Sequence, residues 1–203
     1  MVTIVDYGMG NLGSIFNMFK KIGVPSKITS NKSEIEKAEK ILLPGVGSFD
    51  AAMNKINELD FKELLNYKAL EEKIPVLGIC LGMQLLTNSS EEGILPGLGW
   101  IPAETLKFKF EKEQNLKIPH MGWNLVEKNR DSKLTEGFID ETRFYFVHSY
   151  YVKCQYDSNS ILKTTYGLTF DSAIQNENIY GAQFHPEKSH KFGMNLLMNF
   201  SKI

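Results

Sequence analysis

The stretch VLGICLGMQLL, residues 76–86, decides the fold, because a buried apolar run gives way there to a helical pattern around one cysteine. Gly78, Cys80 and Gly82 form a G-x-C-x-G pattern, which is the thiol counterpart of a nucleophile elbow. Glycines suit such a sharp turn, since a Cβ atom would clash there. A helix that begins at this point favours a thiolate, and the N–H of Leu81 would face an oxyanion. Cys80 is therefore a candidate nucleophile. The alternative is a small, buried packing residue.

The sequence on both sides of this corner predicts the fold class. Strands are expected at 2–7, 25–30, 40–45 and 74–80, and helices at 11–22, 32–39, 48–57 and 60–72. This order predicts an α/β, flavodoxin-like fold with a mainly parallel central sheet flanked by helices. Short aromatic and β-branched strands then recur until a last helix near 189–200, which predicts an additional mixed β portion in the second half. The segment 110–117 reads as a polar loop or hairpin tip, and we expect a single domain over 1–203.

Composition excludes several classes of function. The 203 residues carry a formal net charge of −1, which does not favour nucleic acid or a membrane surface as the main partner. No apolar run approaches the length of a membrane span, and the N-terminus lacks the pattern of a signal peptide. The two cysteines are too few for a disulfide framework, and no cysteine–histidine cluster has zinc spacing. We expect a cytoplasmic protein with reduced thiols and no metal.

A thiol nucleophile needs a base, and the base needs an acceptor that orients it. Among the four histidines, His185 stands out because Glu187 follows two residues later, across Pro186, in QFHPEKS (183–189). Residues at i and i+2 of an extended segment face the same side, and proline holds the pair rigid. Taken alone, this motif is more typical of a surface turn. His148 is the rival base, but no acidic residue lies within two positions of it.

Two motifs, GICLGMQLL (78–86) and FHPEKS (184–189), together resemble those of the triad (class I) glutamine amidotransferases, which hydrolyse glutamine and pass the ammonia on. Within that family, the chain is similar to the glutaminase subunits of imidazole glycerol phosphate synthase in histidine biosynthesis. The further motifs that carry this similarity are DYGMGNLGS, PGVGSF, PHMGWN and FVHSYY. The resemblance runs from the first strand to the last helix. It implies Cys80 as nucleophile, His185 as base and Glu187 as orienting partner, with no cofactor.

The resemblance also implies the residues that surround the triad. The PGVG loop, which follows a strand, would complete the oxyanion hole. The residues of the oxyanion hole would be Gly45, Val46, Gly47 and Leu81. L-Glutamine would be bound by Gln84, Ser149 and Tyr150, the last two largely through backbone groups. Gln84 lies one helical turn beyond Cys80, which places it on the face of the nucleophile. The non-functional alternatives are an ordinary strand-to-helix turn for the PGVG loop and an ordinary edge strand for the segment with Ser149 and Tyr150.

The implied partner is a (β/α)₈-barrel cyclase that docks on the face carrying the triad and forms a heterodimer with this chain. PHMGWN (119–124) is expected to be a surface loop, where exposed tryptophan and methionine suggest an interface. The candidate interface residues are Asn11, His120, Met121, Trp123 and Lys188. Asn11 belongs to GMGNLG (8–13), which also matches a dinucleotide fingerprint, but no acidic residue follows at the second strand's end to bind a ribose.

Two other functions compete with this interpretation. The first is the same glutaminase chemistry serving a synthase that amidates a surface-polysaccharide sugar. It is supported by the lack of arginine in LKFKFEKEQNLK (106–117) and by the unusual histidine that ends HPEKSH (185–190). The second, from another class, is a non-catalytic flavodoxin-like binding protein that keeps the elbow as a relic.

Overall fold

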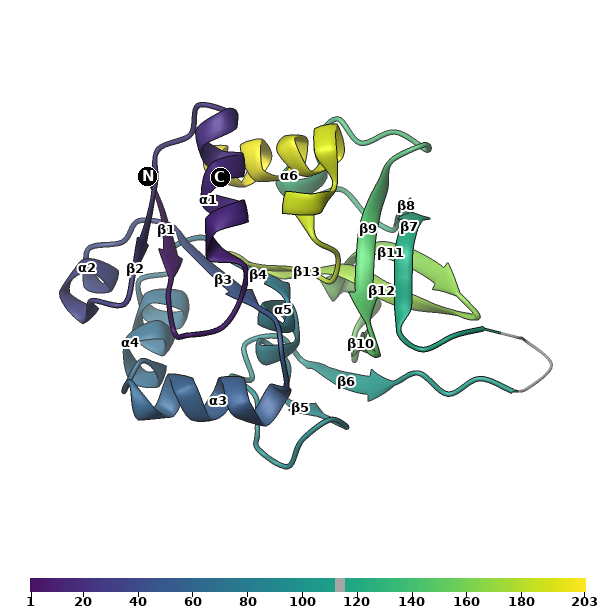
Figure 1. The fold of residues 1–203 in the computed structure, drawn as a ribbon, viewed down its shortest axis with the longest axis horizontal. Helices are drawn as coiled ribbons and strands as arrows, with labels where there is room; N and C mark the ends of the chain where they lie inside the picture. Colours follow the sequence, from purple (N-terminus) through teal and green to yellow (C-terminus); the bar gives the residue numbers. More distant parts are fainter. Residues whose placement is uncertain (112–115) are drawn as a thin grey trace.

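The computed structural model describes residues 1–111 and 116–203, and within them eleven strands join into one sheet (Figure 1). The strands of this sheet are β1 (Val2–Val5), β2 (Ser26–Thr29), β3 (Ile41–Gly45), β4 (Val76–Cys80), β5 (Ser89–Ser90), β6 (Ala103–Lys107), β8 (Glu127–Lys128), β10 (Tyr150–Cys154), β11 (Ser160–Tyr166), β12 (Leu168–Asn176) and β13 (Ile179–Ala182). Along the main path their order is β2-β1-β3-β4-β13-β12-β10-β6-β5.

The half of the sheet that includes the quoted corner is parallel. Strands β2, β1, β3, β4 and β13 all run in one direction, so their carboxyl ends meet at the same edge. β3 and β4 are buried throughout, as expected for apolar strands covered on both faces. The α-helices of the chain are α1 (Leu12–Lys21), α2 (Lys32–Glu36), α3 (Phe49–Glu58), α4 (Lys62–Asn66), α5 (Leu81–Leu85) and α6 (His190–Lys202).

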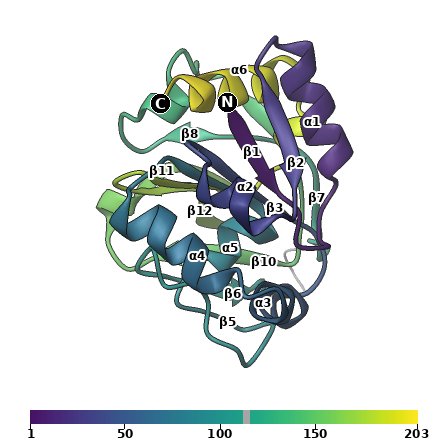
Figure 2. The same cartoon turned by 90° about the vertical axis from the view of Figure 1, so that its left-hand side faces the viewer.

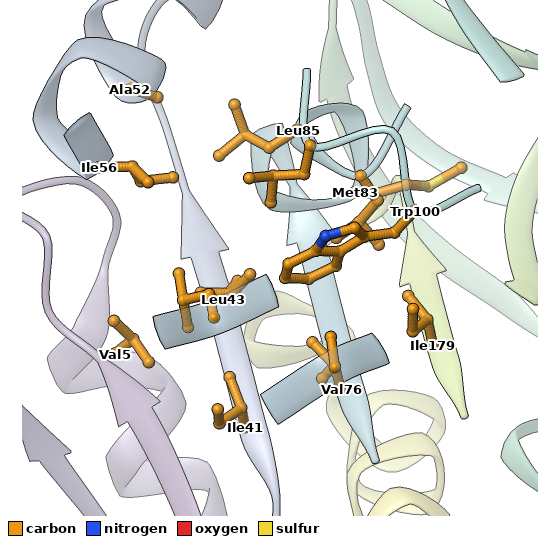
Figure 3. Close-up of a cluster of buried hydrophobic side chains, with 14 of the residues drawn as sticks. Val5, Ile41, Leu43, Ala52, Ile56, Val76, Met83, Leu85, Trp100 and Ile179 are labelled. Carbon is orange, nitrogen blue, oxygen red and sulfur yellow. The ribbon is translucent and has the colours of Figure 1, made fainter. Parts of the chain in front are cut away.

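Helices cover both faces of this parallel half. Helices α1 and α6 lie together on one face, and α3, α4 and α5 lie on the other (Figures 1 and 2). Alternate strand residues supply two separate cores: Ile41 and Leu43 pack toward α3 and α5, while Leu42 packs toward α1 and α6. Figure 3 shows the first core, in which strand side chains meet those of α3, α5 and Trp100. The predicted α/β fold with a mainly parallel sheet is confirmed.

The second half of the chain forms the predicted mixed β portion. Strands β12, β10 and β6 continue the sheet in antiparallel pairs. A separate two-stranded sheet joins β7 (His120–Leu125) to β9 (Arg143–His148), with His120 opposite His148. The prediction of a surface loop at 119–124 is therefore wrong for most of this segment. β7 turns polar side chains inward and apolar ones outward, which inverts the usual alternation and hid the strand.

Other boundaries differ by a few residues from the predictions. The helix expected at 32–39 ends at Glu36, and the one expected at 60–72 is divided into α4 and a π-helical turn over Tyr67–Glu71. That turn buries Lys68, whose ammonium group binds the Glu72 carboxylate and the Glu36 carbonyl. Short 3-10 turns of the described residues occupy Lys133–Thr135, Asp157–Asn159 and Pro186–Lys188. Part of the loop expected at 110–117, residues 112–115, lies outside the described residues.

Candidate active site

Cys80 occupies a sharp turn between β4 and α5. Its backbone has φ 54° and ψ −112°, in a region that non-glycine residues rarely adopt. Such strain persists only where the surrounding structure enforces it, and it is common at functional sites. The side chain is 7% exposed. The thiol is thus held in a fixed direction at the carboxyl edge of the parallel strands.

The two glycines of G-x-C-x-G are required by close packing of backbone. A Cβ atom on Gly78 would lie 2.5 Å from the carbonyl oxygen of Gly82. A Cβ atom on Gly82 would lie 1.9 Å from the carbonyl oxygen of Leu43 in β3. Neither backbone oxygen can move away easily, since both belong to packed elements. The pattern seen in the sequence therefore reflects the approach of α5 to strand β3.

The predicted oxyanion loop lies directly beside Cys80. In the parallel pair of β3 and β4, Gly45 is opposite Cys80, so the 45–47 loop begins next to the thiol. The hydroxyl of buried Tyr7 donates to the carbonyl of Pro44 and holds the strand at this end. The Val46 side chain is exposed. This loop and the first turn of α5 thus border the same point.

His185 and Glu187 form a buried pair beyond the end of β13, the strand next to β4. The Nδ1 atom of His185 lies 2.8 Å from the Oε1 atom of Glu187. Their side chains are 4% and 2% exposed, and the turn over Pro186–Lys188 brings the carboxylate back to the edge of the ring. His185 Nε2 and Glu187 Oε2 make no hydrogen bond to any described residue. Nε2 is therefore free to exchange a proton with a reacting group.

The surroundings of His185 favour its charged form. Burial alone would lower its pKa, but the side chains of Cys80 and Glu187 outweigh that effect and raise the pKa to about 10. A buried imidazolium between a sulfur atom and a carboxylate is the arrangement that activates a thiol nucleophile. Three residues that are far apart in the chain therefore lie together at the cleft.

Ser189 anchors the backbone of His185 and was not found by sequence reasoning. Its hydroxyl donates to the His185 carbonyl at 2.6 Å and accepts from the N–H of Tyr145 at 3.0 Å. The N–H of His185 in turn donates to the Tyr145 carbonyl at 2.9 Å. Strand β9 thus fixes the position of His185. Ser189 does follow the H-P-E motif directly, but no pattern in the sequence signals its contact with β9.

Gln84, predicted to bind substrate, is held within a network of amides. Its Nε2 atom donates to Gln183 Oε1 at 3.1 Å and to the Tyr150 carbonyl at 3.3 Å. Gln183 Nε2 donates in turn to the sulfur of Cys80 at 3.8 Å. Gln183 was missed in the sequence, although it lies two residues before His185 and so on the same side of the chain.

A cleft of about 340 Å³ opens beside Cys80 and collects the predicted site residues. It is lined by Val46, Gly47, Cys80, Leu81, Gln84, Glu92, Pro119, Val147, His148, Ser149, Tyr150, His185 and Lys188. Glu92 is the charged lining residue that sequence reasoning missed. Its Oε2 atom accepts from the N–H of Phe49, the first residue of α3, at 2.9 Å. In the sequence Glu92 lies between the two halves of the fold, where no motif marks it.

His148, the rival candidate for the base, also lines the cleft. Its Nδ1 atom is 2.7 Å from the Tyr150 carbonyl, and its Nε2 atom is 2.9 Å from Nδ1 of His120. Burial lowers the pKa of His148 to about 3. Both ring nitrogens are therefore engaged in a neutral ring, whereas Nε2 of His185 is not.

The predicted interface residues occupy different environments. Met121 is 61% exposed and Trp123 is 44% exposed, and the Trp123 ring stacks on His190. His120 is buried, so its ring is not presented to a partner, and its prediction as an interface side chain is not carried forward. The Lys188 ammonium group lies 5.6 Å from the centre of the Tyr145 ring at the cleft. The exposed Asn11 caps α1 by accepting from the N–H of Ser14.

Neither a metal cluster nor a membrane span is found in the described part of the chain. Over residues 1–111 and 116–203, no group of three or more histidine, cysteine, aspartate or glutamate side chains could hold a metal ion. No helix in those ranges has the length and apolar character to cross a membrane.

Curated relatives match the chain over its whole length. An imidazole glycerol phosphate synthase subunit HisH 2 from Methanococcus maripaludis is 56% identical over 202 residues, which cover 100% of this chain and 99% of that protein. The corresponding subunit HisH from Bdellovibrio bacteriovorus is 48% identical, with both chains fully covered. A HisH 2 from Pseudomonas aeruginosa is 43% identical, again over both full lengths.

Solved structures share the fold at low sequence identity. A structure described as a glutamine amidotransferase has a TM-score of 0.75 at 16% identity and covers 100% of both chains. PurLQS from Thermotoga maritima has a TM-score of 0.71 at 18% identity, covering 99% of this chain and 97% of that one. The model of the family described as Glutamine amidotransferase class-I matches residues 3–203. The backbone of Cys80 is strained, a buried histidine–glutamate pair lies at the same cleft, and the family match covers residues 3–203. The chain therefore belongs to the class-I glutamine amidotransferases, as its motifs predict.

Proposed function

We propose that this chain is the glutaminase subunit of an imidazole glycerol phosphate synthase, which hydrolyses L-glutamine and passes ammonia to a cyclase subunit. The observation that carries the proposal is Cys80, strained at its elbow beside the buried pair of His185 and Glu187. The names of relatives up to 56% identical support the choice of synthase, since none of the three described above refers to sugar amidation.

In the proposed reaction, the Cys80 thiolate attacks the side-chain carboxamide carbon of glutamine. The N–H groups of Leu81 and of the 45–47 loop donate to the developing oxyanion. His185, charged because of its raised pKa, transfers a proton from Nε2 to the departing nitrogen, so that ammonia leaves and a γ-glutamyl thioester remains. His185 then takes a proton from water, which attacks the thioester and releases glutamate. Glu187 stabilises the imidazolium throughout.

The α-amino and α-carboxylate groups of glutamine need partners at the outer end of the cleft. Ser149 and Tyr150 supply backbone groups there, and Gln84 lies between them and the thiol. Glu92 provides a carboxylate of the correct sign for the α-ammonium group. One of its oxygens accepts from the N–H of Phe49, which holds the carboxylate at the wall of the cleft. We therefore add Glu92 to the substrate-binding residues.

The partner follows from the fate of ammonia. Ammonia released into neutral water becomes ammonium, which is not a nucleophile, so it must pass directly to a second active site. The side chains of Val46, which lines the cleft, and of Met121 and Trp123, which follow the lining residue Pro119, are exposed and offer an apolar docking surface. The resemblance implies a (β/α)₈ barrel for the docked cyclase, and a cytoplasmic heterodimer remains our expectation.

The proposal is tested by labelling with 6-diazo-5-oxo-L-norleucine, a glutamine analogue that alkylates glutaminase thiols. We expect saturable labelling at Cys80, protection by L-glutamine and complete loss in Cys80→Ala. Cys154→Ala is the matched control, because burial and the nearby Asp171 raise the pKa of that thiol and keep it unreactive. A full-length chain that is not labelled, alone or with its cyclase, would support the non-catalytic alternative.

The ammonia acceptor is tested genetically. Co-expression of this chain with the cyclase from the same genome should restore growth of a histidine auxotroph that lacks both subunits, and Cys80→Ala should not. Glutaminase turnover should be weak for the chain alone and strongly stimulated by the cyclase with its ligand. Growth failure with intact labelling would favour the sugar-amidating alternative, while equal turnover with and without the partner would refute the coupling.

A further inference from the structure

Two buried histidines that the proposed mechanism does not use join strand β7 to the glutamine cleft. The Nδ1 atom of His148 lies 2.7 Å from the Tyr150 carbonyl oxygen. The Nδ1 atom of His120 lies 2.9 Å from Nε2 of His148. The Nδ2 atom of Asn124 lies 3.2 Å from Nε2 of His120. These contacts form an unbroken chain of three side chains that ends on a residue lining the cleft.

The groups at the two ends of this series of hydrogen bonds determine which ring nitrogen of each histidine carries its hydrogen. The Tyr150 carbonyl can only accept, so His148 carries its hydrogen on Nδ1. At the other end, Asn124 Oδ1 accepts from the N–H of Leu125 at 2.9 Å, and Nδ2 donates to the Thr165 carbonyl at 3.0 Å. The amide nitrogen therefore faces His120 and donates to its Nε2, and His120 donates from Nδ1 to Nε2 of His148. Both rings are neutral Nδ1–H tautomers.

The surroundings of the two rings keep them neutral. His120 and His148 are 3% and 5% exposed, and they pack against Phe108, Phe146 and Phe170. Burial lowers the pKa of His120 to about 4 and that of His148 to about 3, and the charge of His185 adds to the effect on His148. Two other titratable rings lie in this cluster. Tyr166 stacks on His120, and Tyr151 contacts Phe108.

We propose that Asn124, His120 and His148 form a neutral, one-directional hydrogen-bond relay whose members are positioning residues for glutamine binding. The relay holds the Tyr150 carbonyl from the side of β7, while Gln84 holds it from the side of α5. The Ser149–Tyr150 wall is thereby fixed between strand β7 of the two-stranded sheet and helix α5. A proton on either ring would place a donor against a donor and break the relay. This proposal rests on the proposed function, because the wall matters only if glutamine binds there.

The first experiment measures the tautomers without any substrate. Long-range ¹⁵N–¹H spectra of the full-length, ¹⁵N-histidine-labelled chain should show His120 and His148 as neutral Nδ1–H rings at pH 7 and still neutral at pH 5.5. Assignment uses His120→Asn, and the surface residue His190 serves as the internal reference for an accessible ring. An Nε2–H tautomer or a charged ring at either position at pH 7 would overturn the proposal.

The second experiment measures the cleft through labelling of Cys80 by 6-diazo-5-oxo-L-norleucine at varied concentration. His120→Phe keeps the ring stacking on Phe146 but removes the donor to His148, so the half-saturating concentration should rise about tenfold, with the maximal labelling rate unchanged. His120→Asn keeps a donor at the Nδ1 position and should restore the half-saturating concentration to within about threefold of wild type. Reaction with iodoacetamide, which needs no glutamine site, should be equal in all three.

Phe170→Leu is the matched control, since it removes packing from the same aromatic cluster but no hydrogen bond. It should lower stability and leave the half-saturating concentration unchanged. An equal rise in Phe170→Leu and His120→Phe, or no rescue by His120→Asn, would overturn the relay as a positioning device. Failure of the proposed function looks different: Cys80 of the wild type would not be labelled at all, while the spectra would still decide the tautomers.

Discussion

At the level of single residues, the candidate site depends on a backbone that only a few residue types allow. Cys80 is held at φ 54° at a strand-to-helix turn. The turn closes because Gly82 lies against the Leu43 carbonyl with no room for a Cβ atom. Strain at one residue and close packing at another therefore have the same origin, which is the approach of α5 to β3. Substitution at this contact should be far more harmful than at a glycine with free space.

We expect Gly82→Ala to lower the free energy of unfolding by about 3 kcal/mol and to abolish labelling of Cys80, because the methyl group would overlap backbone. Gly13→Ala is the control: Gly13 lies in α1 with no atom within 4 Å of the added methyl, so stability should rise by about 0.5 kcal/mol. Urea unfolding measures both. A Gly82→Ala protein of wild-type stability would contradict the close approach.

Glu92 allows a second test at the level of one side chain. Glu92→Gln should raise the KM for glutamine about 10- to 100-fold with a smaller change in kcat, since it removes a charge paired with the α-ammonium group. Glu91→Gln is the neighbouring control, because that carboxylate binds Lys107 and Lys109 instead of lining the cleft. Steady-state glutaminase assays measure KM and kcat for both variants. Equal effects in both variants would remove Glu92 from the substrate site.

At the level of elements, strand β7 has two distinct faces. His120 and Asn124 point inward and belong to the relay, whereas Met121 and Trp123 point outward and are exposed. A single strand therefore contributes both to the relay that reaches the cleft through His148 and to the apolar surface proposed for a partner. Its inverted polarity pattern also explains why sequence periodicity predicted a loop there.

Met121→Glu should weaken binding of the cyclase about tenfold or more, because it places a charge in the apolar docking surface. Labelling of the isolated chain by the glutamine analogue should not change. Ile139→Glu alters an equally exposed side chain, 61% in both cases, outside β7 and the cleft lining. It should leave the dissociation constant, measured by calorimetry, at the wild-type value. Equal weakening by both substitutions would argue against docking through β7.

At the level of the whole molecule, buried histidines make stability depend on pH. In the folded chain the pKa values of His120 and His148 lie near 4 and 3, below the value of about 6.5 expected for the unfolded chain. The unfolded state therefore binds more protons between these limits, and stability falls as the pH drops below about 6.5. His185 acts in the opposite direction: its pKa near 10 adds stability that is lost as the pH rises from about 6.5 to 10.

His120→Asn removes one of the groups that titrate on the acid side. Between pH 6 and 4.5, the loss of unfolding free energy per pH unit should be smaller than in wild type by up to about 1.4 kcal/mol. Phe170→Leu should lower stability at every pH without changing the slope. Urea unfolding at several pH values tests this, and parallel curves for wild type and His120→Asn would show that His120 is not held neutral by the fold.

The sequence by itself determined the alternation of strands and helices, the elbow around Cys80 and the His185–Glu187 pair, because each depends on neighbours only a few residues away. Their family resemblance is confirmed, whereas the roles assigned to single residues and the extent of one domain over 1–203 remain predictions. Only the tertiary structure decided that β7 exists, that His120 is buried, and that Gln183, Glu92 and Ser189 belong to the site. These features depend on contacts between elements far apart in the chain, and hydrogen bonds of that kind leave no period or spacing in the sequence.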